Sequence, residues 1–245
     1  MAELKKLEKA QEIILDPSKH IIIRLDGHKF SKIKFEKPFE DRLGNAMVET
    51  TKDLLERFGA YTAFTQSDEI TLFIPSLWDN DVKKDWVHIF GGRVQKITSV
   101  IAGYTTMRFN SNYSGKIDAC FDCRVYTCHS DSDVIRSFSS RVSNCEQNSR
   151  SMFAHVYCSH KELHGLSGEE RVKLSENKGA DWSSVGDIYK HGTFVKKESY
   201  LHPSGVIRQR ICTFLGDNYN YYSGLILLKS IGSLLSISEA LPEQV

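Results

Sequence analysis

The chain has 245 residues, of which 40% are hydrophobic and 26% are charged, the ordinary composition of a globular protein with one large domain or a compact pair. The 32 basic and 31 acidic side chains give a formal net charge of +1, which argues against a histone-like or polybasic membrane-binding protein. The sequence contains no apolar run of about 18 residues and begins with a charged segment that lacks the apolar core of a signal peptide. We therefore expect a cytoplasmic protein with no membrane association.

The first part of the sequence alternates between helical and strand patterns. Residues 3–13 have the apolar spacing of a short amphipathic helix, and the apolar run at residues 20–25 predicts a first strand. A second amphipathic helix is predicted at residues 39–58, and Gly59 ends it. Two apolar runs that flank residues 66–69 predict a β-hairpin.

A long helix is then predicted at residues 80–104. It contains Gly91 and Gly92, which weaken a helix unless a neighbouring helix or a substrate approaches closely there. A further strand is predicted at residues 120–128. The order of these elements, β-α-β-β-α-β, is the ferredoxin-like arrangement of an α+β fold.

The pattern changes beyond residue 130. Helical segments are predicted within residues 131–163, weak strands at residues 192–197 and 207–214, and a helical or amphipathic segment at residues 225–235. With no internal repeat or low-complexity linker, we expect one continuous body: a palm-like catalytic domain at residues 1–130, and an accessory α/β region at residues 131–245 packed on it.

Six cysteines are expected to be reduced thiols, because disulfides are rare in the cytoplasm. Cys120 and Cys123 form a C-x-x-C pair, which is half of a common zinc motif. No second C-x-x-C follows, although His155 and His160 are five residues apart. We interpret the pair as ordinary strand and loop thiols and leave any special role open.

Two carboxylate positions follow apolar runs that are typical of buried strands. Asp26 ends the first strand and precedes Gly27, while Asp68 and Glu69 lie at the hairpin turn. Each motif by itself is typical of an ordinary turn. In a ferredoxin-like fold, however, the first strand and the hairpin strands are neighbours, so Asp26 and Asp68 converge. Paired carboxylates on rigid strands suit a two-metal phosphoryl- or nucleotidyl-transfer site, whereas Glu69 is expected to point to the other face.

Four ordered motifs resemble the tRNA(His) guanylyltransferase family, whose members add nucleotides to RNA 5′ ends in the 3′–5′ direction. They are Ile23-Arg24-Leu25-Asp26-Gly27-His28-Lys29-Phe30, then Phe35-Glu36-Lys37-Pro38 with Asp41-Arg42, then Gln66-Ser67-Asp68-Glu69, and Phe121-Asp122-Cys123-Arg124-Val125. The resemblance implies a polymerase-like palm. It also implies activation of the RNA 5′ end by ATP or GTP, followed by attack of the 3′-OH of an incoming NTP.

The resemblance also implies roles for individual residues. It carries over Asp26, Gly27 and Asp68 as ligands of two Mg²⁺ ions, with Glu69 as a structural acid beside them. It assigns nucleotide binding to Gly27, His28, Lys29, Phe30, Ser31, Lys37 and Ser67. It assigns phosphate or RNA contacts to Arg93, Lys96, Asn148 and Lys178.

The chain departs from the family pattern at three places. The segment Glu146-Gln147-Asn148-Ser149-Arg150-Ser151-Met152 replaces the eukaryotic His-Ile-Asn-Asp-Leu-Tyr-Asn type, and Ser31 replaces a family histidine. Lys178 aligns only loosely. These departures resemble the guanylyltransferase-like branch, which favours template-directed repair of tRNA 5′ ends over untemplated G addition to tRNA(His).

Because the net charge is near zero, RNA binding requires clustered cations, and we expect them on a face that spans Arg93, Lys96 and the basic residues at 136–178. The resemblance further suggests a homotetramer. Two alternatives stay open: a palm-fold nucleotide or diguanylate cyclase, which shares the metal carboxylates, and a non-catalytic RNA-binding protein. The hairpin lacks the Gly-Gly-Asp/Glu-Glu-Phe sequence of diguanylate cyclases, and the intact acids argue against the second alternative.

Overall fold

The computed structural model describes residues 2–77, 87–218 and 223–232. Its centre is a mixed sheet whose strands follow the order β4-β1-β3-β2-β5-β6, with β7 beside β5. Neighbouring strands along this order are antiparallel, and β7 alone among the described strands pairs in parallel. The bounds are β1 His20–Gly27, β2 Thr62–Gln66, β3 Glu69–Ile74, β4 Phe121–Cys128, β5 Thr193–Leu201, β6 Ile207–Leu215 and β7 Ile231–Gly232.

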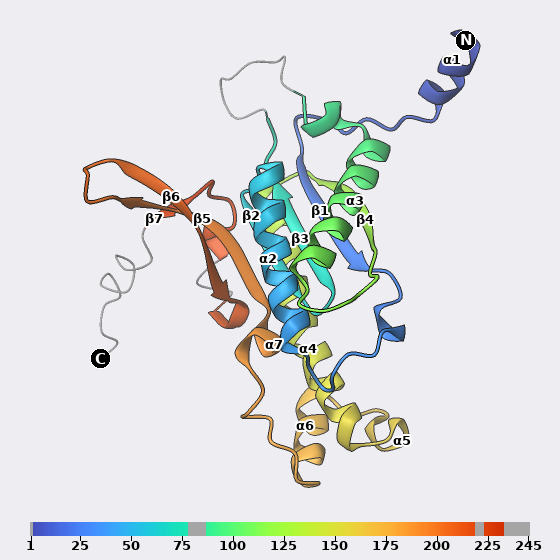
Figure 1. Cartoon of the computed structure of the whole chain (residues 1–245), viewed down its shortest axis with the longest axis vertical. Helices are drawn as coiled ribbons and strands as arrows, with labels where there is room; N and C mark the ends of the chain where they lie inside the picture. Colours follow the sequence, from blue (N-terminus) through green and yellow to red (C-terminus); the bar gives the residue numbers. More distant parts are fainter. Residues whose placement is uncertain (1, 78–86, 219–222, 233–245) are drawn as a thin grey trace.

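The ferredoxin-like core is confirmed. Helix α2 (Asp41–Phe58) connects β1 to β2, and α3 (Val94–Asn112) connects β3 to β4. Both helices cover the same face of the sheet (Figure 1). The side chains between them and the sheet form the larger of the apolar cores, which includes Leu54, Ile97 and Ile101. Gly59 ends α2 in the left-handed conformation, as the sequence predicts.

The opposite face is covered by α4 (Asp131–Tyr157), whose first turn is held by a capping box between Ser130 and Asp133. Phe138 and Val142 of α4 pack against phenylalanines of the sheet in a second core. The chain continues through α5 (His160–Leu163), α6 (Gly168–Glu176) and α7 (Asp187–His191) before it returns to the sheet as β5. The helical prediction for residues 131–163 is therefore confirmed, and the later strands add to the palm sheet through β2.

Strand β1 determines what each face of the sheet receives, because successive side chains point to opposite sides. Ile21, Ile23 and Leu25 belong to the core beneath α2 and α3. Ile22 belongs to the core beneath α4, and Asp26 is on the same face as Ile22. The carboxylate at the end of β1 therefore faces the α4 side of the molecule.

The prediction of one continuous helix at residues 80–104 is wrong in its described part. Residues 80–86 lie outside the described residues, and α3 begins only at Val94 and continues to Asn112. Before it, Phe90, Gly91 and Gly92 have positive φ values, so the chain turns there instead of continuing a helix. A Cβ at Gly92 would lie 3.0 Å from the Leu15 carbonyl oxygen. The glycines thus allow close approach of the segment before β1, not of a helix or a substrate.

Two further predictions need correction at the chain ends. Helix α1 covers Ala2–Ala10 rather than residues 3–13, and it extends away from the sheet (Figure 1). Instead of a helix at residues 225–235, the described part contains a short 3₁₀ turn at Ser223–Leu225 and the strand β7; residues 233–235 lie outside the described residues. Across the described ranges, no helix has the length and apolarity needed to cross a membrane.

Candidate active site

The fold brings the two predicted carboxylate positions together at one end of the sheet. The Gly27 amide donates a hydrogen bond to the Asp68 carbonyl oxygen (N···O 3.0 Å), so the end of β1 is tied to the β2–β3 turn. Partial burial, and next the nearby charge of Asp26, raise the pKa of the Asp68 carboxyl. The two acids therefore repel each other at neutral pH, and a cation between them would relieve that repulsion.

Gly27 is required by the packing of the loop that follows it. A Cβ at this position would lie 2.4 Å from the ring of Phe30, far inside van der Waals contact. The ring is buried and also packs against Phe109 and Phe121. The loop after β1 is therefore folded back tightly over the strand end.

The backbone of this loop offers fewer free amides than the sequence suggests. The amides of Gly27 and His28, two of the predicted nucleotide-binding residues, donate to the carbonyl oxygens of Asp68 and Cys120 within the protein. Lys29 has a left-handed backbone (φ 59°) and precedes a 3₁₀ turn at Phe30–Lys32. This succession of conformations makes an anion-binding nest, to which Lys29, Phe30 and Ser31 contribute amides.

The hairpin turn is compact. Only Ser67 and Asp68 separate β2 from β3, and Ser67 has a positive φ of 48°, as two-residue hairpin loops require. A positive φ costs energy in a residue with a side chain. This turn therefore holds Asp68 in a defined position beside the end of β1.

A cavity of about 340 Å³ opens beside Asp68. Its walls come from the loop at residues 30–40, the first turns of α2, the β2–β3 turn, the middle of α4, and α7. Six of the predicted site residues line it, namely Phe30, Ser31, Lys37, Ser67, Asp68 and Asn148. The structure thus places Asn148, which was expected at phosphate or RNA, in the wall of this cavity.

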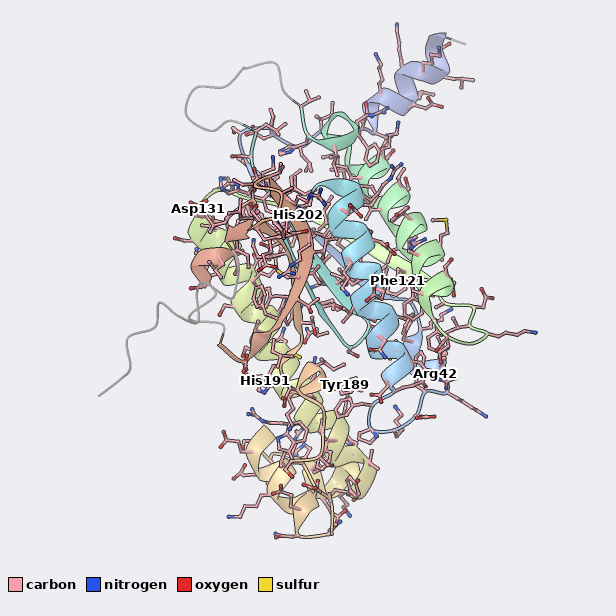
Figure 2. All side chains as sticks on the ribbon, turned by 60° about the vertical axis from the view of Figure 1, so that its left-hand side comes forward. Arg42, Phe121, Asp131, Tyr189, His191 and His202 are labelled. Atoms are coloured by element: carbon pink, nitrogen blue, oxygen red, sulfur yellow. The ribbon has the colours of Figure 1, made fainter. Side chains whose placement is uncertain are left out.

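Sequence reasoning missed the apolar side chains of the cavity. Leu43 and Met47 of α2 and Met152 of α4 line it, but their helical spacing indicated only core positions. Phe39 stacks on Tyr189 of α7 with ring centroids 4.7 Å apart, and the Tyr189 hydroxyl donates to Asp41 (O···O 2.7 Å). Figure 2 shows Tyr189 beside the end of α2 that carries Arg42. No local signal links residue 189 to residue 39, because only the fold brings them together.

Glu69 lies on the same face of the sheet as Asp26, its partner in the β1–β3 register. The sequence predicts that Glu69 points to the opposite face of the sheet from the metal acids. For Asp26 this prediction is wrong, because the Asp26 and Glu69 side chains point to the same face. Its carboxylate pairs with Arg141 at 3.2 Å and lies 3.8 Å from the Arg24 Nε. With two arginines around it, Glu69 anchors α4 to the strand ends.

Three of the predicted cationic contacts lie away from the cavity. Arg93 pairs with Glu12 in the segment that precedes β1, whereas Asp26 is at the other end of that strand. Lys96 of α3 lies over the ring of Phe90. Lys178 pairs with Glu162 at 2.7 Å in the loop after α6. The expected face that joins Arg93 and Lys96 to residues 136–178 is not formed, because α3 and α4 are on opposite faces of the sheet.

The two thiols of the C-x-x-C pair are free cysteines. Burial raises the pKa of Cys123 to about 12, and its side chain packs against the core under α2 and α3. Cys120 is exposed. This is the environment of structural thiols rather than of reactive ones.

The oxygen donors at the strand ends suit a hard cation. In the described part of the chain, no group of three or more His, Cys, Asp and Glu side chains forms a metal cage. Mg²⁺ does not need one, since it is commonly held by one or two carboxylates together with substrate phosphates and water. Asp26 and Asp68 provide such a pair, and the repulsion between them fits a site that binds a cation.

Comparisons with known proteins agree with this geometry. The model of the family described as tRNAHis guanylyltransferase matches residues 1–145. A solved bacterial tRNA(His) guanylyltransferase-like protein in complex with ATP is 29% identical, with a TM-score of 0.76 over 93% of this chain and 98% of that chain. A bacterial structure in complex with GTP is 27% identical, with a TM-score of 0.73 over the same shares of the two chains.

Two further proteins resemble this chain, one in fold and one in sequence. The tRNA(His) guanylyltransferase of Saccharomyces cerevisiae shares the fold, with a TM-score of 0.68 and 18% identity over 80% of this chain and 92% of that chain. An uncharacterized protein of Acanthamoeba polyphaga mimivirus is 33% identical over 221 residues, 80% of this chain and 76% of that protein. The family model covers more than half of the sequence, and the chain therefore belongs to the tRNA(His) guanylyltransferase family of nucleotidyltransferases.

Proposed function

We propose that this protein adds nucleotides to the 5′ end of tRNA in the 3′–5′ direction under the guidance of a template strand, and so repairs truncated 5′ ends. Addition of G to tRNA(His) is the second candidate reaction. The observation that carries the proposal is the hydrogen bond from the Gly27 amide to the Asp68 carbonyl oxygen, which brings the end of β1 with Asp26 to a hairpin turn beside a cavity that would accommodate a nucleoside. Family membership supports the general chemistry of nucleotide addition to tRNA.

The reaction has two stages. An oxygen of the RNA 5′-monophosphate first attacks the α-phosphorus of ATP or GTP and displaces pyrophosphate, which leaves the 5′ end joined to AMP or GMP. The 3′-OH of an incoming NTP then attacks the activated phosphate and displaces the activating group. Asp26, Asp68 and the Gly27 carbonyl would hold two Mg²⁺ ions, which would neutralise charge on the attacking and leaving oxygens. The protein itself contributes position and charge rather than a general base.

The nucleotide site combines the nest and the cavity. The amides of Lys29, Phe30 and Ser31 would receive the triphosphate, with Lys37 beside it, while the cavity would enclose the base and sugar. The bacterial relatives were solved with ATP and with GTP, and we extend binding of both nucleotides to this chain. Ser67 and Asn148, both in the cavity wall, complete the proposed contacts.

Template-directed repair is favoured over untemplated G addition by the segment at residues 146–152. This segment lacks the eukaryotic His-Ile-Asn-Asp-Leu-Tyr-Asn pattern, and its Asn148 and Met152 line the nucleoside cavity. Residues in the cavity wall would contact the incoming base, so a different sequence at these positions would change which base the site selects. The bacterial structures with a guanylyltransferase-like description are consistent with this choice.

We also propose the division into a palm-like catalytic unit at residues 1–130 and an accessory region at residues 131–245, and a homotetrameric assembly. The accessory region contributes α4 and α7 to the cavity. The catalytic unit alone would therefore lack part of its nucleotide site.

The test offers 5′-truncated tRNAs, whose 3′ strands either match or mismatch the missing nucleotides, to the protein with ATP, Mg²⁺ and labelled NTPs. Addition that depends on the matching strand supports repair, and equal addition to both substrates contradicts it. GTP and Mg²⁺ without RNA form the control for the cyclase alternative, since a cyclic product would contradict the proposal. Binding of tRNA without any addition would favour the non-catalytic alternative.

A further inference from the structure

A second depression lies along the first half of α4, before the helix reaches the nucleoside cavity. This β4–α4 groove has a volume of about 480 Å³ and is lined by Arg24 of β1, Tyr126 of β4, and Arg136 and Arg141 of α4. Among its described lining residues three are arginines and one, Asp133, is a carboxylate. Since the whole chain carries a net charge of only +1, this groove concentrates positive charge locally.

The inner end of the groove has more guanidinium groups than carboxylates. Arg141 and Arg24 share the single carboxylate of Glu69, at 3.2 Å and 3.8 Å. The Arg24 Nε is buried and has no hydrogen-bond partner. Because two guanidinium groups share one carboxylate and one of them lacks a hydrogen bond, this end of the groove retains capacity to hold an anion.

The outer end of the groove is held by a weak ion pair. Arg136 pairs with Asp133 three residues earlier at 2.6 Å, and its side chain is 76% exposed. Ion pairs this exposed contribute little to stability, so Arg136 can exchange Asp133 for another anion at small cost. Tyr126 is 44% exposed and offers an aromatic surface in the same groove.

The strand register connects the groove to the acids at the site. On β1 and β4 the paired positions Asp26 and Asp122, Arg24 and Arg124, and Ile22 and Tyr126 follow one another on the α4 face. A strand rises about 3.3 Å per residue, so Tyr126 lies about 13 Å along β4 from the end where Asp26 is. The α4 face of β1 and β4 thus leads from the end that carries Asp26, beside the nucleoside cavity that Asp68 lines, to the arginine-lined groove.

We propose that the β4–α4 groove binds the RNA strand next to its 5′ end, with Arg24, Arg136 and Arg141 on backbone phosphates and Tyr126 stacked on a base. Arg136 and Arg141 are about 7.5 Å apart along the axis of α4, which suits separate phosphates. Arginine with exposed aromatic side chains is the usual combination for single-stranded RNA. This inference rests on the proposed function, and it replaces the RNA face expected from Arg93 and Lys96.

The test measures the affinity of the full-length protein for a 5′-monophosphorylated, 5′-truncated tRNA by fluorescence anisotropy at several salt concentrations. Arg136→Gln should weaken binding about tenfold and reduce the slope of log affinity against log salt by about 0.7. Tyr126→Leu should weaken binding by about fivefold or more, whereas Tyr126→Phe keeps the ring and should bind like wild type. Arg57→Gln is the matched control, because it removes one exposed cation from α2 on the opposite face of the sheet.

Binding of GTP and ATP is measured on the same variants. If Arg136→Gln weakens nucleotide binding and leaves tRNA affinity unchanged, the groove holds a nucleotide triphosphate and the inference is wrong. The inference is also wrong if the wild type adds nucleotides but Arg136→Gln and Tyr126→Leu have the same tRNA affinity, and the same dependence of that affinity on salt, as the control Arg57→Gln. Failure of the proposed function is a different result, since there the wild type binds tRNA but adds nothing.

Discussion

The Gly27 amide donates a hydrogen bond to the carbonyl oxygen of Asp68 across 3.0 Å, and this contact joins two residues that are forty-one positions apart in the sequence. It fixes the end of β1 to a hairpin turn that is itself constrained by the positive φ of Ser67. Each acid is consequently held by backbone geometry rather than by a flexible side-chain network. Mg²⁺ demands near-ideal octahedral geometry, so such rigidity is what a metal site would require.

Asp68→Asn should abolish nucleotide addition and stabilise the metal-free protein. The pKa of Asp68 is raised in the folded state by burial and by Asp26, so its ionisation at neutral pH favours unfolding. The amide removes that charge at nearly the same volume. Thermal unfolding should show a higher Tm for the variant without divalent ions, and a rise of Tm with Mg²⁺ in the wild type only. If Mg²⁺ raised the Tm of both proteins equally, Asp68 would not be a ligand of the metal.

Gly27→Ala should disrupt the loop that carries the nest. Its Cβ would lie 2.4 Å from the Phe30 ring, and overpacking of this kind costs about 1–3 kcal/mol. We expect a lower free energy of unfolding in urea and a large loss of nucleotide addition. Gly103→Ala is the control, because a Cβ there meets nothing within 4 Å in the exposed part of α3; it should stabilise the protein by about 0.5–1 kcal/mol. Equal stability of the two variants would contradict the packing argument.

Tyr189→Ala should raise the KM for the nucleotide about tenfold, because the ring forms a wall of the cavity and stacks on Phe39. Tyr189→Phe keeps the stack and loses only the hydrogen bond to Asp41, so its KM should stay within about threefold of wild type. Steady-state kinetics with a fixed tRNA concentration separates the two. A KM for Tyr189→Ala equal to that of the wild type would show that the nucleoside does not occupy this cavity.

Lys196 should make the stability of the protein rise with pH. It is fully buried, its Nζ donates to the Tyr61 and Leu228 carbonyl oxygens and to Thr62 Oγ1, and burial lowers its pKa to about 7. In the unfolded chain a lysine keeps its proton up to about pH 10.4. Between these values the unfolded state binds more protons, so the free energy of unfolding increases with pH.

Urea denaturation at several pH values from about 6.5 to 10 measures this effect. In Lys196→Met, the free energy of unfolding should rise less with pH than in the wild type, because the contribution of Lys196 is lost. The variant also leaves three hydrogen-bond acceptors unpaired, which changes its stability at every pH, so the slope against pH is the quantity to compare. Lys197→Met, at the neighbouring and less buried position, should keep the increase. A wild-type curve that falls over this range and parallels that of Lys196→Met would contradict the assignment.

Several features could be read from local sequence because they depend on neighbouring residues. The apolar run of β1, the helix that ends at Gly59 and the hairpin around Ser67 and Asp68 all have short-range causes. The prediction of one helix at residues 80–104 fails because Phe90 and Gly91 adopt left-handed conformations. At its other end, α3 extends to Asn112 through polar residues such as Asn110, whose side chain is hydrogen-bonded to the backbone of Ala119.

By itself the sequence determined the order of the strands and helices in the ferredoxin-like core, and the family, and it singled out Asp26 and Asp68 as candidate acids, because short motifs and local periodicity specify these features. Only the tertiary structure decided that Gly27 and His28 use their amides internally, that Tyr189 closes a cavity over Phe39, and that Arg93 and Arg141 are on opposite faces of the sheet. The physical reason is that these relationships join residues distant in the chain. Their geometry depends on how α3 and α4 pack on the sheet, which no local pattern specifies.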